Sequence, residues 1–84
     1  MYSKERAVIR KELRNAIIKK RAELRISQEK MSGLLHISLR SYTDIEHGKS
    51  MPCTYTLINF MLLFKNDVFA MLKEIENKIN ETEY

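Results

Sequence analysis

Residues that interrupt a helix are scarce in this chain. The sequence contains two glycines, Gly33 and Gly48, and one proline, Pro52, among its 84 residues. Apolar residues recur at roughly helical spacing, and no stretch alternates apolar and polar residues as a half-buried strand does. We therefore expect an all-α protein.

The apolar pattern divides the chain into five helical segments. A long amphipathic helix is expected over 3–25, and its basic face is expected to be solvated. Ser27 and Ser38 are favourable N-caps for two short helices, and Gly48 suits the left-handed residue that ends the second one. The last two helices are expected at the run YTLINFMLLF and over about 67–80.

The expected core follows from these segments. The run YTLINFMLLF is apolar on every side, so we expect its helix to be nearly surrounded by protein at the centre of the core. In the first short helix, the spacing predicts burial of Met31, Leu34 and Leu35.

Length and composition restrict the class of protein. A chain of 84 residues is expected to form a single domain over 1–84. It has no apolar run of about 18 residues and no resemblance to a signal peptide, so we expect a cytoplasmic protein without a membrane partner. One cysteine and two histidines favour neither a disulfide nor a metal site, and no catalytic constellation is visible. We expect no enzyme activity and no cofactor.

Two short helices joined by a turn of three or four residues have the arrangement of a helix-turn-helix. The segment SQEKMSGLLHISLRSYTDIEHGKSMP closely resembles the core of the Cro and phage-repressor family, the XRE-type helix-turn-helix proteins. The resemblance covers about 13–66, with the helix-turn-helix at 28–47 and the last helix outside the common core. It implies an all-α, five-helix lambda-repressor-like DNA-binding domain with an additional C-terminal helix.

The resemblance also implies which residues contact double-stranded DNA. It places the third helix in the major groove, where base edges carry a distinct pattern of donors and acceptors. The expected base readers are the outward residues of that helix: Leu39, Arg40, Thr43 and Asp44. Arg40 is the strongest candidate, because a guanidinium can bind guanine bidentately. The expected phosphate contacts are Gln28 in the first turn of the second helix and the polar residues around the third helix: Ser38, Ser41, His47 and Lys49.

Other positions have structural roles in the family's pattern. Glu46 is expected to form an ion pair with Arg21 of the first helix. His36 stands where the family usually has a glycine with positive φ, so a strained or reshaped turn is expected there. Cys53 replaces a frequent serine, which leaves Thr54 to cap the fourth helix.

The predicted function is that of a sequence-specific transcriptional regulator, a repressor that binds a pseudo-palindromic operator as a homodimer. The apolar stripe of the last helix exceeds what a small core needs, which favours dimerisation through its members: Val68, Met71, Leu72, Ile75 and Ile79. Packing of this stripe on the chain's own core remains the alternative. The alternative function is a protein-interaction or antitoxin-type module that uses the same fold with a protein partner.

Overall fold

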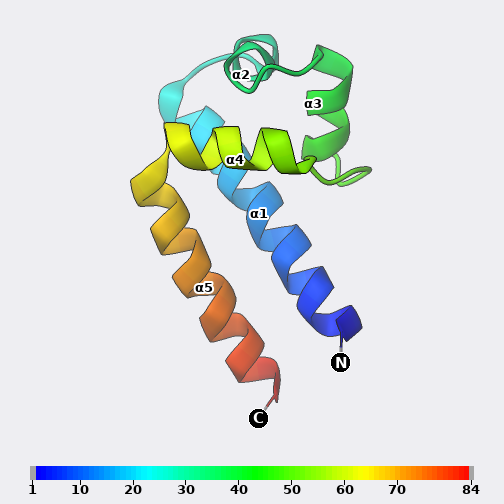
Figure 1. Cartoon of the computed structure of the whole chain (residues 1–84), viewed down its shortest axis with the longest axis vertical. Coiled ribbons are helices and arrows are strands. Elements are labelled where there is room, and N and C mark those ends of the chain that lie inside the picture. The colour runs from blue at the N-terminus through cyan, green and yellow to red at the C-terminus, as the bar shows by residue number, and fades with distance from the viewer. Residues whose placement is uncertain (1, 84) are drawn as a thin grey trace.

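A computed structural model describes residues 2–83 of the chain and shows an all-α protein (Figure 1). The helices in the described part follow one another without strands: α1 (Tyr2–Leu24), α2 (Gln28–Leu34), α3 (Leu39–Glu46), α4 (Thr54–Leu63) and α5 (Lys65–Glu83). The segments agree with the expected helices, although α5 is longer than the apolar pattern indicated. The all-α prediction is confirmed.

The boundaries of the short helices follow from capping residues. The side-chain oxygen of Ser27 accepts a hydrogen bond from the backbone N–H of Lys30, and that of Ser38 accepts one from the backbone N–H of Ser41. These bonds satisfy N–H groups that have no partner within the helix. Gly48 follows α3 with φ +76°, the left-handed conformation that glycine adopts without strain. The two predicted serine caps and the predicted glycine stop are confirmed.

The longest helices, α1 and α5, run antiparallel and side by side (Figure 1). Two ion pairs connect them: Lys20 with Asp67 at 2.8 Å, and Lys78 with Glu12 at 3.1 Å. The start of α1 and the end of α5 therefore lie at the same end of the molecule, whereas α2, α3 and α4 lie at the other end.

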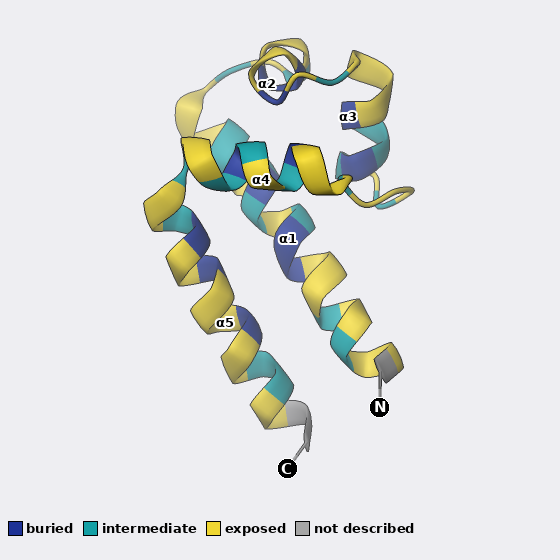
Figure 2. Cartoon of the chain, viewed as in Figure 1, coloured by how far each residue is buried: buried dark blue, intermediate teal, exposed yellow. Residues whose placement is uncertain are grey.

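The core lies between these elements. It is built from one side of α1, the inner faces of α2 and α3, and a few residues of α4 and α5 (Figure 2). Its buried apolar members are Leu13, Ile17, Met31, Leu35, Tyr42, Ile45, Phe60, Val68, Met71 and Ile75. Leu34, which was expected to be buried, is 36% exposed, and the buried residues of α2 are Met31 and Ser32.

The expectation that α4 forms the centre of the core is wrong. Only Thr56 and Phe60 of this helix are buried. Tyr55, Ile58 and Leu62 are 68%, 50% and 62% exposed, respectively. None of the other helices in the described residues covers the outer side of α4, so its apolar residues remain in contact with solvent.

The expected cap of α4 is also wrong. Cys53 occupies the N-cap position with an extended backbone and makes no capping hydrogen bond through its side chain, and Thr54 is already the first residue of the helix. The thiol instead lies 3.4 Å from the hydroxyl of Thr56.

The apolar stripe of α5 is largely buried within the chain. Val68, Met71 and Ile75 belong to the core, and Ile79 packs against it. Leu72 is 52% exposed. The structure therefore has the alternative packing that the sequence left open for this stripe, in which α5 folds back on α1. None of the helices in the described part of the chain is long and apolar enough to cross a membrane.

Candidate nucleic-acid interface

One face of α3 holds the helix against the rest of the domain. Tyr42 is fully buried and Ile45 is 4% exposed. Ile37, just before the helix, packs against the same core. Tyr42 and Ile45 on one face of α3, together with Ile37 before it, fix the position of the helix, so its other face has a defined orientation.

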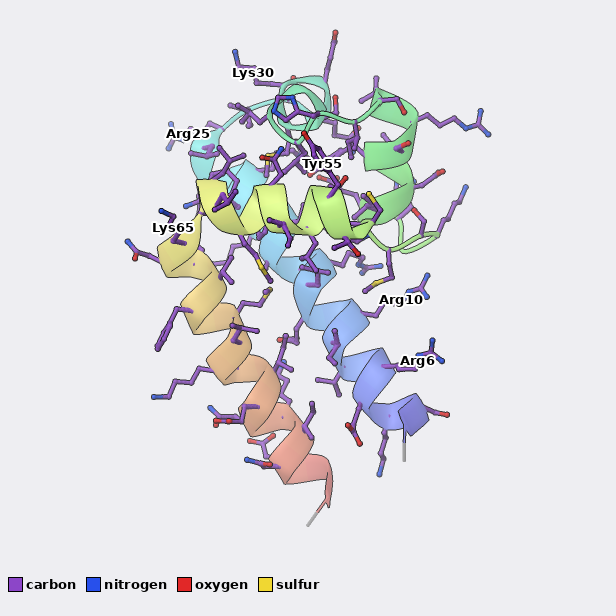
Figure 3. The ribbon with its side chains drawn as sticks, in the orientation of Figure 1. Arg6, Arg10, Arg25, Lys30, Tyr55 and Lys65 are labelled. Atoms are coloured by element: carbon purple, nitrogen blue, oxygen red, sulfur yellow. The ribbon has the colours of Figure 1, made fainter. Side chains whose placement is uncertain are left out.

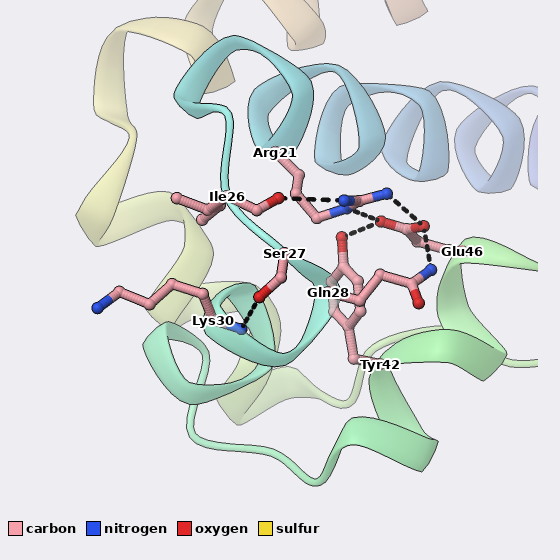
Figure 4. A network of polar contacts seen from close by, with 7 residues as sticks. All are labelled: Arg21, Ile26, Ser27, Gln28, Lys30, Tyr42 and Glu46. Carbon is pink, nitrogen blue, oxygen red and sulfur yellow. Dashed lines mark hydrogen bonds and ion pairs between the residues drawn. The ribbon is translucent and has the colours of Figure 1, made fainter.

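The carboxylate of Glu46 accepts hydrogen bonds from two other helices, α1 and α2, and from its own helix, α3 (Figure 4). Arg21 of α1 donates through Nε to Glu46 Oε2 at 2.7 Å and through Nη2 to Oε1 at 3.3 Å. Gln28 Nε2 of α2 donates to Glu46 Oε1 at 2.9 Å, and the Tyr42 hydroxyl donates to Oε2. Arg21 also donates to the carbonyl of Ile26, at 3.1 Å, in the connection between α1 and α2. This Glu46 network joins α1, α2 and α3 at one carboxylate.

The electrostatics of the Glu46 network favour its charged form. Burial raises the pKa of the Glu46 carboxyl, but the hydrogen bonds from Arg21, Tyr42 and Gln28 outweigh burial and hold that pKa below its ordinary value. The hydrogen bond to Glu46 raises the pKa of Arg21. Burial, reinforced by Glu46 as acceptor, raises the pKa of Tyr42. Near neutral pH the network therefore contains a carboxylate, a guanidinium and a neutral phenol.

The sequence anticipated only part of this network. The structure contains the Arg21–Glu46 ion pair that the family's pattern implied. The hydrogen bonds from Tyr42 and Gln28 were not predicted, and Gln28 was expected to contact a phosphate instead. The spacing of Tyr42 and Glu46, four residues apart on one helix, was the available signal for the first of these bonds.

The outward face of α3 carries the four expected base readers. Leu39 is 45% exposed and Arg40 is exposed. The guanidinium of Arg40 makes no hydrogen bond or ion pair within the described residues, so it is available to a ligand. Thr43 and Asp44 are half-buried, and the Thr43 hydroxyl donates to the carbonyl of Arg40 at 3.0 Å. The structure places all four on one helix, with Leu39 and Arg40 at its exposed start.

The expected phosphate contacts surround this helix but differ in availability. His47 and Lys49 are exposed at the end of α3. Ser38 and Ser41 are exposed at its start, where their hydroxyls lie 3.0 Å apart. Gln28 is half-buried and one N–H of its amide is committed to Glu46. The structure thus assigns Gln28 a role inside the domain and brings the other four to the borders of α3.

The turns before and after α3 each contain a residue with a positive, left-handed φ. His36, in the turn between α2 and α3, has φ +59°, so the expected positive φ is present with a residue that carries a side chain. Gly48 follows α3, and a Cβ added there would lie 2.8 Å from Nη1 of Arg14. The backbone after α3 therefore passes close to the side of α1.

Other reactive side chains form no second site. Cys53 is exposed, and the hydrogen bond from Thr56 lowers the pKa of its thiol. Over residues 2–83, no group of three or more His, Cys, Asp or Glu residues is placed to hold a metal ion. No family model, curated protein or solved structure matches this chain.

Proposed function

We propose that this chain is a cytoplasmic, sequence-specific DNA-binding transcriptional regulator that represses transcription by occupying an operator. The observation that carries the proposal is the exposed polar face of α3, which stands on a helix fixed from behind by Tyr42, Ile45 and the Glu46 network. A rigid helix with an unpaired arginine at its exposed start is suited to the major groove.

The arrangement of α2 and α3 supports this proposal. The helices have 7 and 8 residues, each begins after a serine cap, and the turn between them is short. Two short helices joined by a short turn are what a helix-turn-helix requires, and the sequence of this pair resembles the XRE-type pattern. We accordingly propose a lambda-repressor-like fold in which α5 is the additional helix.

Within this interface, Arg40 is the proposed reader of a guanine, through its O6 and N7 atoms. Leu39 can contact a thymine methyl group, Thr43 a base edge or a methyl group, and Asp44 a cytosine amino group. His47 and Lys49 are exposed at the end of α3, and their proposed role is to contact the DNA backbone and position the helix.

Selection of bound sequences from a random pool of duplex DNA tests the proposal. The wild-type chain is expected to enrich a defined sequence, and its affinity is expected to fall with salt. Arg40→Ala should lose discrimination at one base position at a cost of about 1–3 kcal/mol. Lys30→Ala, on the outer side of α2, is the matched control and should leave the selected sequence unchanged. Failure of the wild-type chain to enrich any sequence would refute the proposal.

We further propose that the regulator acts as a homodimer through the exposed side of α4. Tyr55, Ile58 and Leu62 lie at i, i+3 and i+7, so they share one face of this helix. Exposed apolar clusters of this kind mark interaction surfaces. A dimer would present two α3 helices to a pseudo-palindromic operator with half-sites about 34 Å apart.

The same face favours the second candidate function, a protein-interaction or antitoxin-type module in which α4 binds a different protein. Light scattering of the purified chain separates the two. If the chain is a dimer, the measured mass should be twice that of the monomer, and the double variant Ile58→Ser/Leu62→Ser should lower it to the mass of one monomer. Ile9→Ser, which changes an exposed apolar residue of α1, is the control and should leave the dimer mass unchanged. A wild-type chain that is monomeric at every concentration would contradict the homodimer, and a stoichiometric partner that co-purifies with it would favour the module.

A further inference from the structure

Three arginines recur every four residues along the first half of α1. Arg6, Arg10 and Arg14 therefore share one face of the helix, over a length of about 12 Å. Figure 3 shows the side chains of Arg6 and Arg10 projecting to the same side of α1, below the connection between α3 and α4. Both residues precede the segment that resembles the repressor pattern, so the resemblance assigns them no role.

This face is continuous with the backbone that follows α3. Arg10 Nη2 donates to the carbonyl of Gly48 at 3.1 Å. The guanidinium of Arg14 lies beside Gly48, and Arg14 Nε is buried without a hydrogen-bond partner in the described structure. Lys49 comes next in the chain and is exposed. Arg6, Arg10, Arg14 and Lys49 together are called the arginine face below.

Within residues 2–83, the arginine face has no counter-charge, in contrast to Lys20 and Arg21 of the same helix. Lys20 pairs with Asp67, and Arg21 pairs with Glu46. No carboxylate of the described residues pairs with a member of the arginine face. A shallow pocket lies beside Arg6 and Arg10, and no Asp or Glu residue is among those that line it: Ser3, Arg6, Ala7, Ile9, Arg10 and Met51.

Contacts within the domain explain the position of only some of the positive charges on the arginine face. Arg10 donates to the carbonyl of Gly48 in the turn that follows α3, where a cation also interacts favourably with the helix dipole. Arg6 has no such contact, and like charges gathered on one face repel each other. A polyanion removes that repulsion, and phosphate oxygens match the geometry of guanidinium groups.

We propose that the arginine face binds the phosphate backbone of DNA flanking the base pairs contacted by α3. Duplex DNA carries one negative charge per about 1.7 Å of its axis, so a face of this length meets several phosphates. The face adjoins the end of α3 through Gly48 and Lys49, which places it beside the proposed interface. This inference rests on the proposed function and extends its contact surface beyond the helix-turn-helix.

The salt dependence of binding tests the inference, because each phosphate contact contributes about 0.9 to the slope of log K against log salt concentration. The probe is a fluorescently labelled duplex that carries the sequence enriched by the wild-type chain, titrated by anisotropy at several salt concentrations. Arg6→Gln should lower the magnitude of the slope by about one, and Arg6→Gln/Arg10→Gln by about two. The discrimination between the enriched sequence and an unrelated duplex should not change in either variant.

The matched control is Lys4→Gln, which removes one charge from an exposed residue about 200° around α1 from Arg6. Equal slopes for Arg6→Gln and Lys4→Gln would overturn the inference, as would an unchanged slope in Arg6→Gln. The Arg6 guanidinium makes no hydrogen bond within the described residues, so Arg6→Gln alone tests the inference even if Arg10→Gln disturbs the loop at Gly48. A wild-type chain that binds no duplex would instead refute the proposed function.

Discussion

Replacing Glu46 by glutamine tests the assignment of the Glu46 network as the junction of α1, α2 and α3. The variant keeps the shape of the side chain and one acceptor oxygen, but it removes the charge that Arg21 and Tyr42 contact. The Arg21 guanidinium then remains partly buried without a counter-charge. We expect the domain to fold with a lower free energy of unfolding.

The magnitude follows from the exposure of the two partners. Hydrogen bonds to charged groups contribute about 1.5–3 kcal/mol each, and removing one partner of a buried ion pair costs about 3–5 kcal/mol. The Glu46 side chain is 7% exposed, but that of Arg21 is 25% exposed, so water relieves part of the loss. We expect Glu46→Gln to cost about 2–3 kcal/mol, which corresponds to a decrease in Tm of roughly 10–20 °C in a domain of this size.

The pH dependence of the difference identifies its cause. The folded-state pKa of Glu46 is lowered, so its contribution to stability is complete above the unfolded-state pKa and is lost as pH falls toward the folded-state pKa. The difference in Tm between wild type and Glu46→Gln should therefore be largest near neutral pH and shrink below about pH 4.3.

Thermal unfolding followed by circular dichroism across this pH range is the assay. Glu29→Gln, which removes an exposed carboxylate from α2, is the control and should change stability by less than about 0.5 kcal/mol. An equal Tm for wild type and Glu46→Gln at neutral pH would refute the reasoning, as would a difference that does not shrink in acid.

Two further substitutions address the backbone near α3 and α4, and thermal unfolding measures both. His36→Gly should raise the free energy of unfolding by about 0.5–1 kcal/mol, because glycine adopts the observed φ of +59° without the cost of a Cβ; a lower Tm would contradict the left-handed turn. Cys53→Ser should also stabilise the domain, by about 0.5–1 kcal/mol, because a serine hydroxyl at the N-cap of α4 can accept a backbone hydrogen bond that the thiol does not. Cys53→Ala is its control and should give no such gain.

The local features of the fold were predictable because neighbouring residues determine them. The caps at Ser27 and Ser38 and the stop at Gly48 depend on residues within one helical turn. The contact between Arg21 and Glu46 was available only from the resemblance, since no local rule joins residues so far apart in the chain.

The position of α4 was not predictable from its composition. A helix that is apolar on every side carries no indication of which side is buried, and the run YTLINFMLLF has no polar face to orient it. Which side is covered depends on how many elements the chain has left to cover it. Likewise, the stripe of α5 is suited to a partner helix, but the pattern does not say whether that helix is α1 of the same chain.

The antiparallel packing of α1 and α5 has a practical consequence for experiments on this protein. Both ends of the described chain lie away from α3, at the opposite end of the molecule (Figure 1). A fluorescent protein or a purification tag attached at either end would extend from that distal end. A fusion at the C-terminal end therefore leaves the outward face of α3 accessible, whereas one at the N-terminal end would lie close to Arg6 of the arginine face.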